Sequence, residues 1–125
     1  MVIAGEPVTV TPRVALTLAL GLHELTTNAT KYGALSVPLG RVEVSWRIER
    51  RTPQRPALRI EWREQGGPPV VPPKQRGFGT RFVEGSVASE LQGRARIQYE
   101  PNGLVCTMDI PLDLVVPDTE VGPHD

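Results

Sequence analysis

Cysteine and histidine are scarce in this sequence of 125 residues. It contains one cysteine, Cys106, and two histidines, His23 and His124. A single cysteine cannot form an internal disulfide, and no Cys-x-x-Cys pair is present. We therefore expect neither a disulfide-stabilised scaffold nor a zinc site.

The sequence also lacks an excess charge and a long hydrophobic run. Fourteen Lys and Arg residues balance fourteen Asp and Glu residues, so binding to nucleic acid is not expected. The longest apolar run, Val14 to Leu22, is interrupted by Thr17 and Gly21 and falls short of the about 20 residues that span a bilayer. The first ten residues do not resemble a secretory signal. We expect a cytoplasmic location and no membrane contact from this segment.

The remaining composition, 39% hydrophobic and 22% charged residues, is that of a folded domain. Thirteen prolines and twelve glycines gather at Pro12, at Gly33, in the stretch 66–79 and in the stretch 116–125. We expect one domain over residues 1–112 and a polar, disordered tail over residues 113–125.

A long helix is predicted from Pro12 to Tyr32. Proline suits the first turn of a helix, and Gly33 suits the left-handed cap that follows the last turn. The i, i+3, i+4 rule places two stripes on neighbouring faces. One stripe is apolar (Leu18, Leu22, Leu25, Ala29), and the other is largely polar (Gly21, Glu24, Asn28, Lys31).

Alternation of apolar and polar residues predicts four strands. The apolar face of each strand consists of every second residue in one of four segments: Val42 to Ile48, Leu58 to Trp62, Ala95 to Tyr99 and Leu104 to Ile110. Pro101-Asn102-Gly103 indicates a hairpin turn, and a second helix is expected from Thr80 to about Leu91, ended by Gly93. The predicted fold is a two-layer α/β (α+β) sandwich, a mixed, largely antiparallel sheet with helices on one face.

Glu64 is the first candidate functional residue. Continuing the pleat by one step places it on the same side as Trp62, beneath the helices, where an acid needs a partner. Alternatively, the strand ends at Arg63 and Glu64 turns into solvent. Gly66 and Gly67 follow and allow the backbone to approach another group closely, so that the carboxylate could accept a hydrogen bond from a purine amine.

The polar stripe of the first helix is the second candidate. Glu24 and Asn28 are four residues apart, with Lys31 one turn on. A carboxylate and an amide oxygen at this spacing can hold Mg²⁺ or its water shell. Most stripes of this kind, however, are solvated helix faces.

The third candidate is the glycine-rich start of the second helix, Gly77-Phe78-Gly79-Thr80. The N–H groups and positive dipole end of a helix N-terminus bind anions, and Lys74 and Arg76 add positive charge. Thr80 could also be only the helix cap. Together the three features describe a nucleoside triphosphate site, without the GxxxxGK[ST] signature of a P-loop.

Three segments, HELTTNATKYGALS, WREQGGPP and GFGT, resemble in order and spacing the ATP-binding domain of HWE-family sensor histidine kinases. The resemblance extends from about Val8 to Leu112. The family is named for a histidine and a Trp-x-Glu motif, which correspond here to His23, Trp62 and Glu64. Taken by itself, His23 is interpreted more readily as a packed structural residue than as a ligand, and Trp62 as a core residue.

The resemblance implies a Bergerat (GHKL) fold that binds ATP and Mg²⁺. It assigns Mg²⁺ binding to Asn28, and a role as base or water-orienting group to the catalytic Glu24. Adenine would be bound by Glu64 in a pocket shaped by Gly66 and Gly67, and residues 68–76 would form a short lid. The remaining residues implied in binding the phosphates or ribose are Lys31, Tyr32, Lys74, Arg76, Gly77, Gly79 and Thr80.

The resemblance further implies transfer of the γ-phosphoryl group of ATP to a histidine in two-component signalling. The expected partners are a dimerisation and phosphoacceptor domain outside this chain, since His124 is a poor acceptor candidate, and a downstream response regulator. Without that acceptor domain, the isolated chain is expected to be inactive in autophosphorylation. Two alternatives stay open: a Ser/Thr kinase like the anti-sigma-factor kinases, and a non-catalytic nucleotide-sensing or protein-interaction module.

Overall fold

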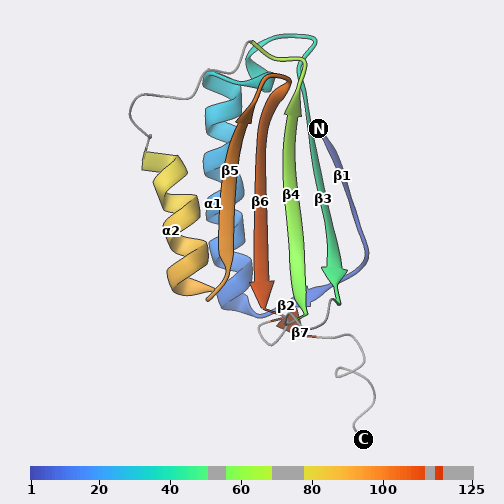
Figure 1. Ribbon diagram of the computed structural model, residues 1–125, viewed down its shortest axis with the longest axis vertical. Helices are drawn as coiled ribbons and strands as arrows, with labels where there is room; N and C mark the ends of the chain where they lie inside the picture. The colour runs from blue at the N-terminus through green and yellow to red at the C-terminus, as the bar shows by residue number, and fades with distance from the viewer. Residues whose placement is uncertain (51–55, 69–77, 112–114, 117–125) are drawn as a thin grey trace, which may run out of the picture.

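The computed structural model describes residues 1–50, 56–68, 78–111 and 115–116. In this part of the chain, two helices pack on one face of a sheet, which confirms the two-layer α+β sandwich (Figure 1). The sheet has the order β1-β3-β4-β6-β5. Its strands are β1 (Val2–Gly5), β3 (Arg41–Glu49), β4 (Ala57–Gln65), β5 (Arg94–Glu100) and β6 (Gly103–Pro111).

The register of the sheet follows from the alternation in the sequence. β1 runs parallel to β3, and the β3–β4, β4–β6 and β6–β5 pairs are antiparallel. Trp62 of the central strand lies opposite Val44 on one side and Cys106 on the other, so all three face the helices. Polar residues take the opposite face, because successive side chains of a strand point to opposite sides.

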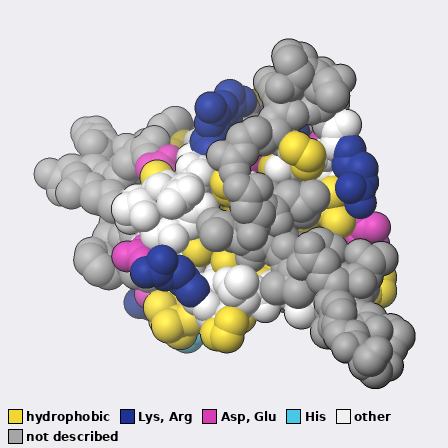
Figure 2. All heavy atoms as spheres, turned by 90° about the horizontal axis from the view of Figure 1, so that it is seen from below, with side chains coloured by type: hydrophobic (Ala, Val, Ile, Leu, Met, Phe, Trp, Pro, Cys, Tyr) yellow, Lys and Arg dark blue, Asp and Glu magenta, His cyan; other side chains and the backbone are white. Residues whose placement is uncertain are grey.

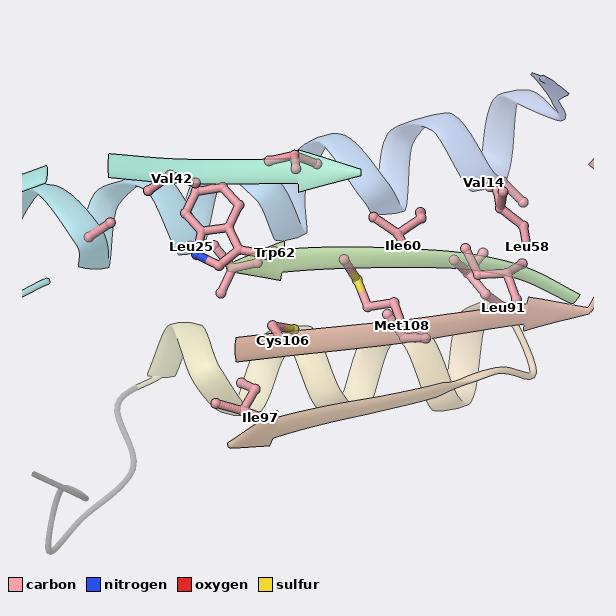
Figure 3. Close-up of a cluster of buried hydrophobic side chains, with 14 of the residues drawn as sticks. Val14, Leu25, Val42, Leu58, Ile60, Trp62, Leu91, Ile97, Cys106 and Met108 are labelled. Atoms are coloured by element: carbon pink, nitrogen blue, oxygen red, sulfur yellow. The ribbon is translucent and has the colours of Figure 1, made fainter. Parts of the chain in front are cut away.

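The core lies between this sheet face and the helices. Figure 3 shows side chains of β4, β6 and α1, and Leu91 just after α2, in the same layer. Each large apolar side chain buried here stabilises the fold by about 1.5–3 kcal/mol before the entropy cost is counted. The largest side chains that are almost fully buried are Trp62, Leu91, Met108, Ile110, Val14, Val42 and Cys106.

Helix α1 (Pro12–Lys31) occupies the predicted range. Its N-cap, Thr11, accepts a hydrogen bond from the backbone N–H of Val14 at 3.4 Å. The left-handed cap expected at Gly33 was wrong: Gly33 has φ −114° and precedes a short 3₁₀ helix, η1 (Ala34–Ser36). A glycine is nevertheless required there, because a Cβ would collide with Oε1 of Glu64.

Helix α2 (Phe78–Glu90) begins two residues before the expected Thr80. The backbone N–H of Gly93 donates to the carbonyl of Val87 at 3.0 Å and so helps to close the helix. The residue in the left-handed region is Gln92, with φ 53°, although glycine is the residue that adopts this conformation at the lowest cost. Gly93 instead has no room for a Cβ, which would meet the carbonyl oxygen of Asp109.

The hairpin between β5 and β6 turns at Pro101 and Asn102, as predicted. The sequence did not predict β1, nor a second sheet in which β2 (Thr9–Val10) pairs antiparallel with β7 (Val115–Val116). β7 lies within residues 113–125, the stretch expected to be a disordered tail, so strand pairing continues past residue 112.

The surface seen from below in Figure 2 is mixed in charge. Lys and Arg side chains lie among acidic and hydrophobic ones and do not gather into a patch of one sign. Within the described ranges, no helix combines the length and the apolar character needed to cross a membrane.

Candidate functional site

The described parts of the three sequence motifs lie toward the same end of the molecule (Figure 1). Figure 1 shows that the C-terminal end of α1, the end of β4 and the beginning of α2 all point toward the same end of the sandwich. A direct contact joins two of them: the backbone N–H of Ala34, three residues after α1, donates to the side chain of Glu64 at 3.0 Å. Segments that are thirty positions apart in the sequence therefore meet at one place.

Glu64 is buried, with 6% of its surface exposed. β4 extends to Gln65, so the alternative in which the strand ends at Arg63 was wrong. Oε1 accepts the N–H of Ala34, and Oε2 accepts the indole N–H of Trp62 at 2.9 Å. Hydrogen bonds to both oxygens offset the cost of burying a carboxylate.

Gly66 and Gly67 permit the close backbone approach that the sequence predicts. Gly66 has φ +74°, a conformation that favours glycine. A Cβ on Gly67 would lie 2.6 Å from the Cα of Ala34. The segment after β4 therefore packs directly on η1 and helps to fix Ala34 beside Glu64.

The polar stripe of α1 lies beside the buried face of the helix. Glu24 and Asn28 are half-buried, whereas Lys31 is exposed. The side chains of Glu24 and Asn28 have no hydrogen-bond partner among the described residues. The described residues contain no group of three or more His, Cys, Asp or Glu side chains that could hold a metal ion. Any cation here would thus need ligands besides the side chains of Glu24 and Asn28, such as phosphate oxygens or water.

Tyr32 is the C-cap of α1, and 76% of its surface is exposed. Its backbone N–H donates to the carbonyl of Asn28 at 2.8 Å. Its ring and the Lys31 side chain are available at the end of the helix for a ligand, and neither contributes to the core.

The two aromatic signature residues differ in position. Trp62 is 1% exposed, which confirms its assignment to the core. His23 is exposed, so its interpretation as a packed structural residue was wrong. The 100° step of an α-helix turns position 23 away from the sheet, and only its backbone carbonyl is engaged, by the hydroxyl of Thr27 at 2.9 Å.

Three of the residues predicted to bind the phosphates lie outside the described residues: Lys74, Arg76 and Gly77. Residues 69–76 of the expected lid also lie outside them. Gly79 and Thr80 fall within the first turn of α2. Because α2 starts at Phe78, Thr80 is an early helical residue and not the cap.

An apolar cavity of about 390 Å³ lies elsewhere in the molecule. α1 contributes Leu18, Leu22 and Thr26 to it, which lie on the flank of the helix opposite Glu24 and Asn28. Among the described residues of the lining, Trp62 is the one predicted site residue. The rest of the lining consists of Met1, Ile3, Val8, Val10, Val44, Trp46, Leu58 and Ile60, and this composition does not suit a charged nucleotide.

Sequence patterns missed the donors that hold Glu64. The spacing of Trp62 and Glu64, two apart on one strand face, could have suggested their contact. The contribution of Ala34 comes from its backbone N–H, a group that every residue except proline carries, so no sequence signal marks it.

No protein-family model matches the chain. Among curated proteins, it is 41% identical over 109 residues to a blue-light-activated histidine kinase of Brucella anthropi. It is 34% identical over 109 residues to one of Brucella ovis. Both alignments cover 87% of this chain and 22% of the relative, so the chain spans about a fifth of the length of these relatives.

Solved structures of histidine kinases share the fold. The histidine kinase domain of the blue-light activated kinase EL346 from Erythrobacter litoralis superimposes with a TM-score of 0.64 and 23% identity, covering 89% of this chain and 50% of that one. The mycobacterial sensor histidine kinase MprB gives a TM-score of 0.59 at 18% identity, covering 88% of this chain and 79% of that one.

In sequence, this chain is thus similar to part of the blue-light-activated histidine kinases, and its fold is that of solved histidine kinase domains. These relatives, which match most of the chain, confirm the resemblance to HWE-family histidine kinases.

Proposed function

We propose that this domain binds Mg·ATP and transfers the γ-phosphoryl group to a histidine of a dimerisation and phosphoacceptor domain outside the chain. A response regulator would receive the group in a later step of two-component signalling. The observation that carries the proposal is the buried Glu64 carboxylate, which accepts a hydrogen bond from the backbone N–H of Ala34, shortly after the last turns of α1. Those turns carry Glu24 and Asn28.

Each residue has a chemical role in this proposal. Glu64 accepts a hydrogen bond from the adenine amine. Gly66 and Gly67 have no side chain, so the backbone beside Glu64 leaves room for the base. Asn28 supplies an amide oxygen to Mg²⁺, a hard donor that suits this cation when phosphate oxygens complete its shell. When bound, Mg²⁺ neutralises charge on the phosphates. The helix start at Gly79, with the other phosphate-side residues, offers N–H groups and positive charge.

Glu24 lies one turn before Asn28 on the same flank of α1. Its carboxylate is half-buried and has no hydrogen-bond partner among the described residues, so it is available to take up the proton of the attacking imidazole or to orient water. The longer relatives support the presence of further domains in a parent kinase.

ATP titration by calorimetry tests the binding site. We expect the wild type to bind ATP more tightly with Mg²⁺ than without it, and Asn28→Ala to lose most of that difference. Gln98→Ala is the control, since Gln98 is exposed and lies on the face of the sheet opposite the helices. Equal Mg²⁺ dependence in the wild type and Asn28→Ala would remove the metal assignment.

Phosphotransfer tests the reaction. A histidine-bearing acceptor domain supplied in trans, with γ-labelled ATP, should acquire acid-labile label. Acid-stable label on serine or threonine would instead indicate a kinase of the anti-sigma-factor type. Absence of any nucleotide-dependent thermal shift would indicate a protein-interaction module, because a ligand at 100 times its Kd adds about 2.7 kcal/mol of stability.

A further inference from the structure

Two protein donors hold the Glu64 side chain, one on each carboxylate oxygen. Trp62 Nε1 donates to Oε2 at 2.9 Å, and the backbone nitrogen of Ala34 donates to Oε1 at 3.0 Å. The donors come from different elements, since Trp62 lies on β4 and Ala34 begins η1. With both oxygens fixed, the carboxylate cannot rotate without breaking a buried hydrogen bond.

This arrangement determines what Glu64 can recognise. A carboxylate offers about four lone-pair positions, and the protein occupies two of them. Each remaining position can only accept a hydrogen bond. A purine whose edge carries an amine can therefore bind, whereas a purine that presents a carbonyl oxygen at the same place meets another acceptor.

We infer that Trp62 is a positioning residue for nucleotide selection: its indole N–H holds Glu64 in the orientation that accepts adenine and disfavours guanine. The inference rests on the proposed ATP-binding function and deepens it. It separates two roles of Trp62, since the ring fills the core and the N–H fixes the carboxylate. A change that removes only the N–H should alter nucleotide preference and leave the core packed.

A tryptophan analogue makes that change. β-(3-Benzothienyl)alanine replaces the indole N–H by sulfur and keeps the shape of the ring. It is introduced at position 62 in the Trp46→Phe variant, so that the analogue enters at position 62 only. Trp46→Phe is also the matched control, because the Trp46 N–H donates to the carbonyl of Glu6 and not to Glu64. We expect the Kd for Mg·ATP to rise roughly tenfold in the analogue protein, with Mg·GTP binding unchanged.

A second pair of variants tests the same orientation through position 64. In Glu64→Gln, the amide nitrogen must face either the Trp62 N–H or the Ala34 N–H, which sets a donor against a donor. In the double variant Trp62→Phe with Glu64→Gln, the amide oxygen accepts from Ala34, and the amide nitrogen is free to donate to the carbonyl oxygen of guanine. The ratio of ATP to GTP affinity should fall at least tenfold between Trp62→Phe and the double variant.

The outcomes separate the inference from the function on which it rests. If the Trp46→Phe parent binds ATP and the analogue protein keeps the same ratio of ATP to GTP affinity, the positioning role is wrong and the binding function stands. An equal loss of affinity for both nucleotides also overturns it, since that is the result of a purely structural role. If neither the wild type nor the parent binds ATP, the proposed function fails and the inference fails with it.

Discussion

Arg59 of β4 and Asp109 of β6 lie opposite each other and form a bidentate ion pair. Nε of Arg59 donates to Oδ1 of Asp109 at 2.7 Å, and Nη2 donates to Oδ2 at 3.1 Å. The hydrogen bond and the charge of Asp109 raise the pKa of Arg59, against an opposing effect of burial. The pair lies on the sheet face opposite the helices and joins two strands whose residues are fifty positions apart.

We expect Asp109→Asn to lower the free energy of unfolding by roughly 0.5–1 kcal/mol, the upper range for a partly exposed pair, because the bidentate geometry is lost. Glu61→Gln is the control, since the Arg63–Glu61 pair, at 2.8 Å, joins residues of one strand. Urea unfolding measures both variants. A loss in Glu61→Gln as large as that in Asp109→Asn would contradict a special role for the pair across the strands.

Gly67→Ala should destabilise the domain by roughly 1–3 kcal/mol and weaken ATP binding. The added Cβ would lie 2.6 Å from Cα and 2.9 Å from the nitrogen of Ala34, so the backbone beside Glu64 must move. Gly85→Ala should instead stabilise by about 0.5–1 kcal/mol, because Gly85 lies inside α2 with nothing within 4 Å of its added Cβ. Thermal unfolding measures the stability of both variants, and ATP titration measures their affinity. Equal stability of the two variants would refute the close approach of Gly67 to Ala34.

Burial, assisted by the charge of Glu84, raises the pKa of the Cys106 thiol from 9.0 to about 12. The unfolded thiol releases its proton at lower pH than the folded one, so this contribution to stability is complete below pH 9 and is lost as the pH rises toward 12. At pH 10 the loss is about 1.4 kcal/mol.

Urea unfolding of the wild type and Cys106→Ala at pH 7 and pH 10 isolates this contribution. Other groups titrate in both proteins, and the cost of the smaller side chain is the same at both pH values, so the difference between the two pH dependences belongs to the thiol. The wild type should lose more stability than the variant does. Parallel losses would show that the thiol ionises as readily in the folded domain as in the unfolded chain.

Glu24→Gln should slow phosphotransfer to the acceptor domain by roughly a hundredfold while leaving the Kd for Mg·ATP within twofold of the wild type. A neutral amide keeps the shape of the side chain but cannot take up a proton. Glu43→Gln, on the exposed face of β3, is the control and should react like the wild type. An undiminished rate in Glu24→Gln would exclude the proton-accepting role.

Alternation predicted the four longer strands of the sheet because one face of each is buried and the other is not. For Glu64 it left two alternatives, and the structure shows the buried one. The same signal could not find β1, whose four residues are all exposed, because alternation is visible only where burial differs between the two faces. β2 and β7 have two residues each, too few for any period to appear.

The errors in the helices have a similar origin. His23 was interpreted as a packed structural residue, although it lies on the same exposed side of α1 as Leu16 and Leu20. Gly33 was interpreted as a left-handed cap, and Gly93 as the residue that ends α2. Each also has a neighbour that a Cβ would strike, Glu64 in one case and the backbone of Asp109 in the other. Such contacts arise from tertiary packing, which local patterns do not report.

The strand order has a consequence for how the chain folds. β5 and β6 join through a tight turn, and β3 and β4 are also neighbours in sequence, so each hairpin can form from local contacts. The central β4–β6 pairing must instead wait until the intervening chain, with α2 in it, has closed. We expect the two hairpins to dock along this seam in the slow step of folding.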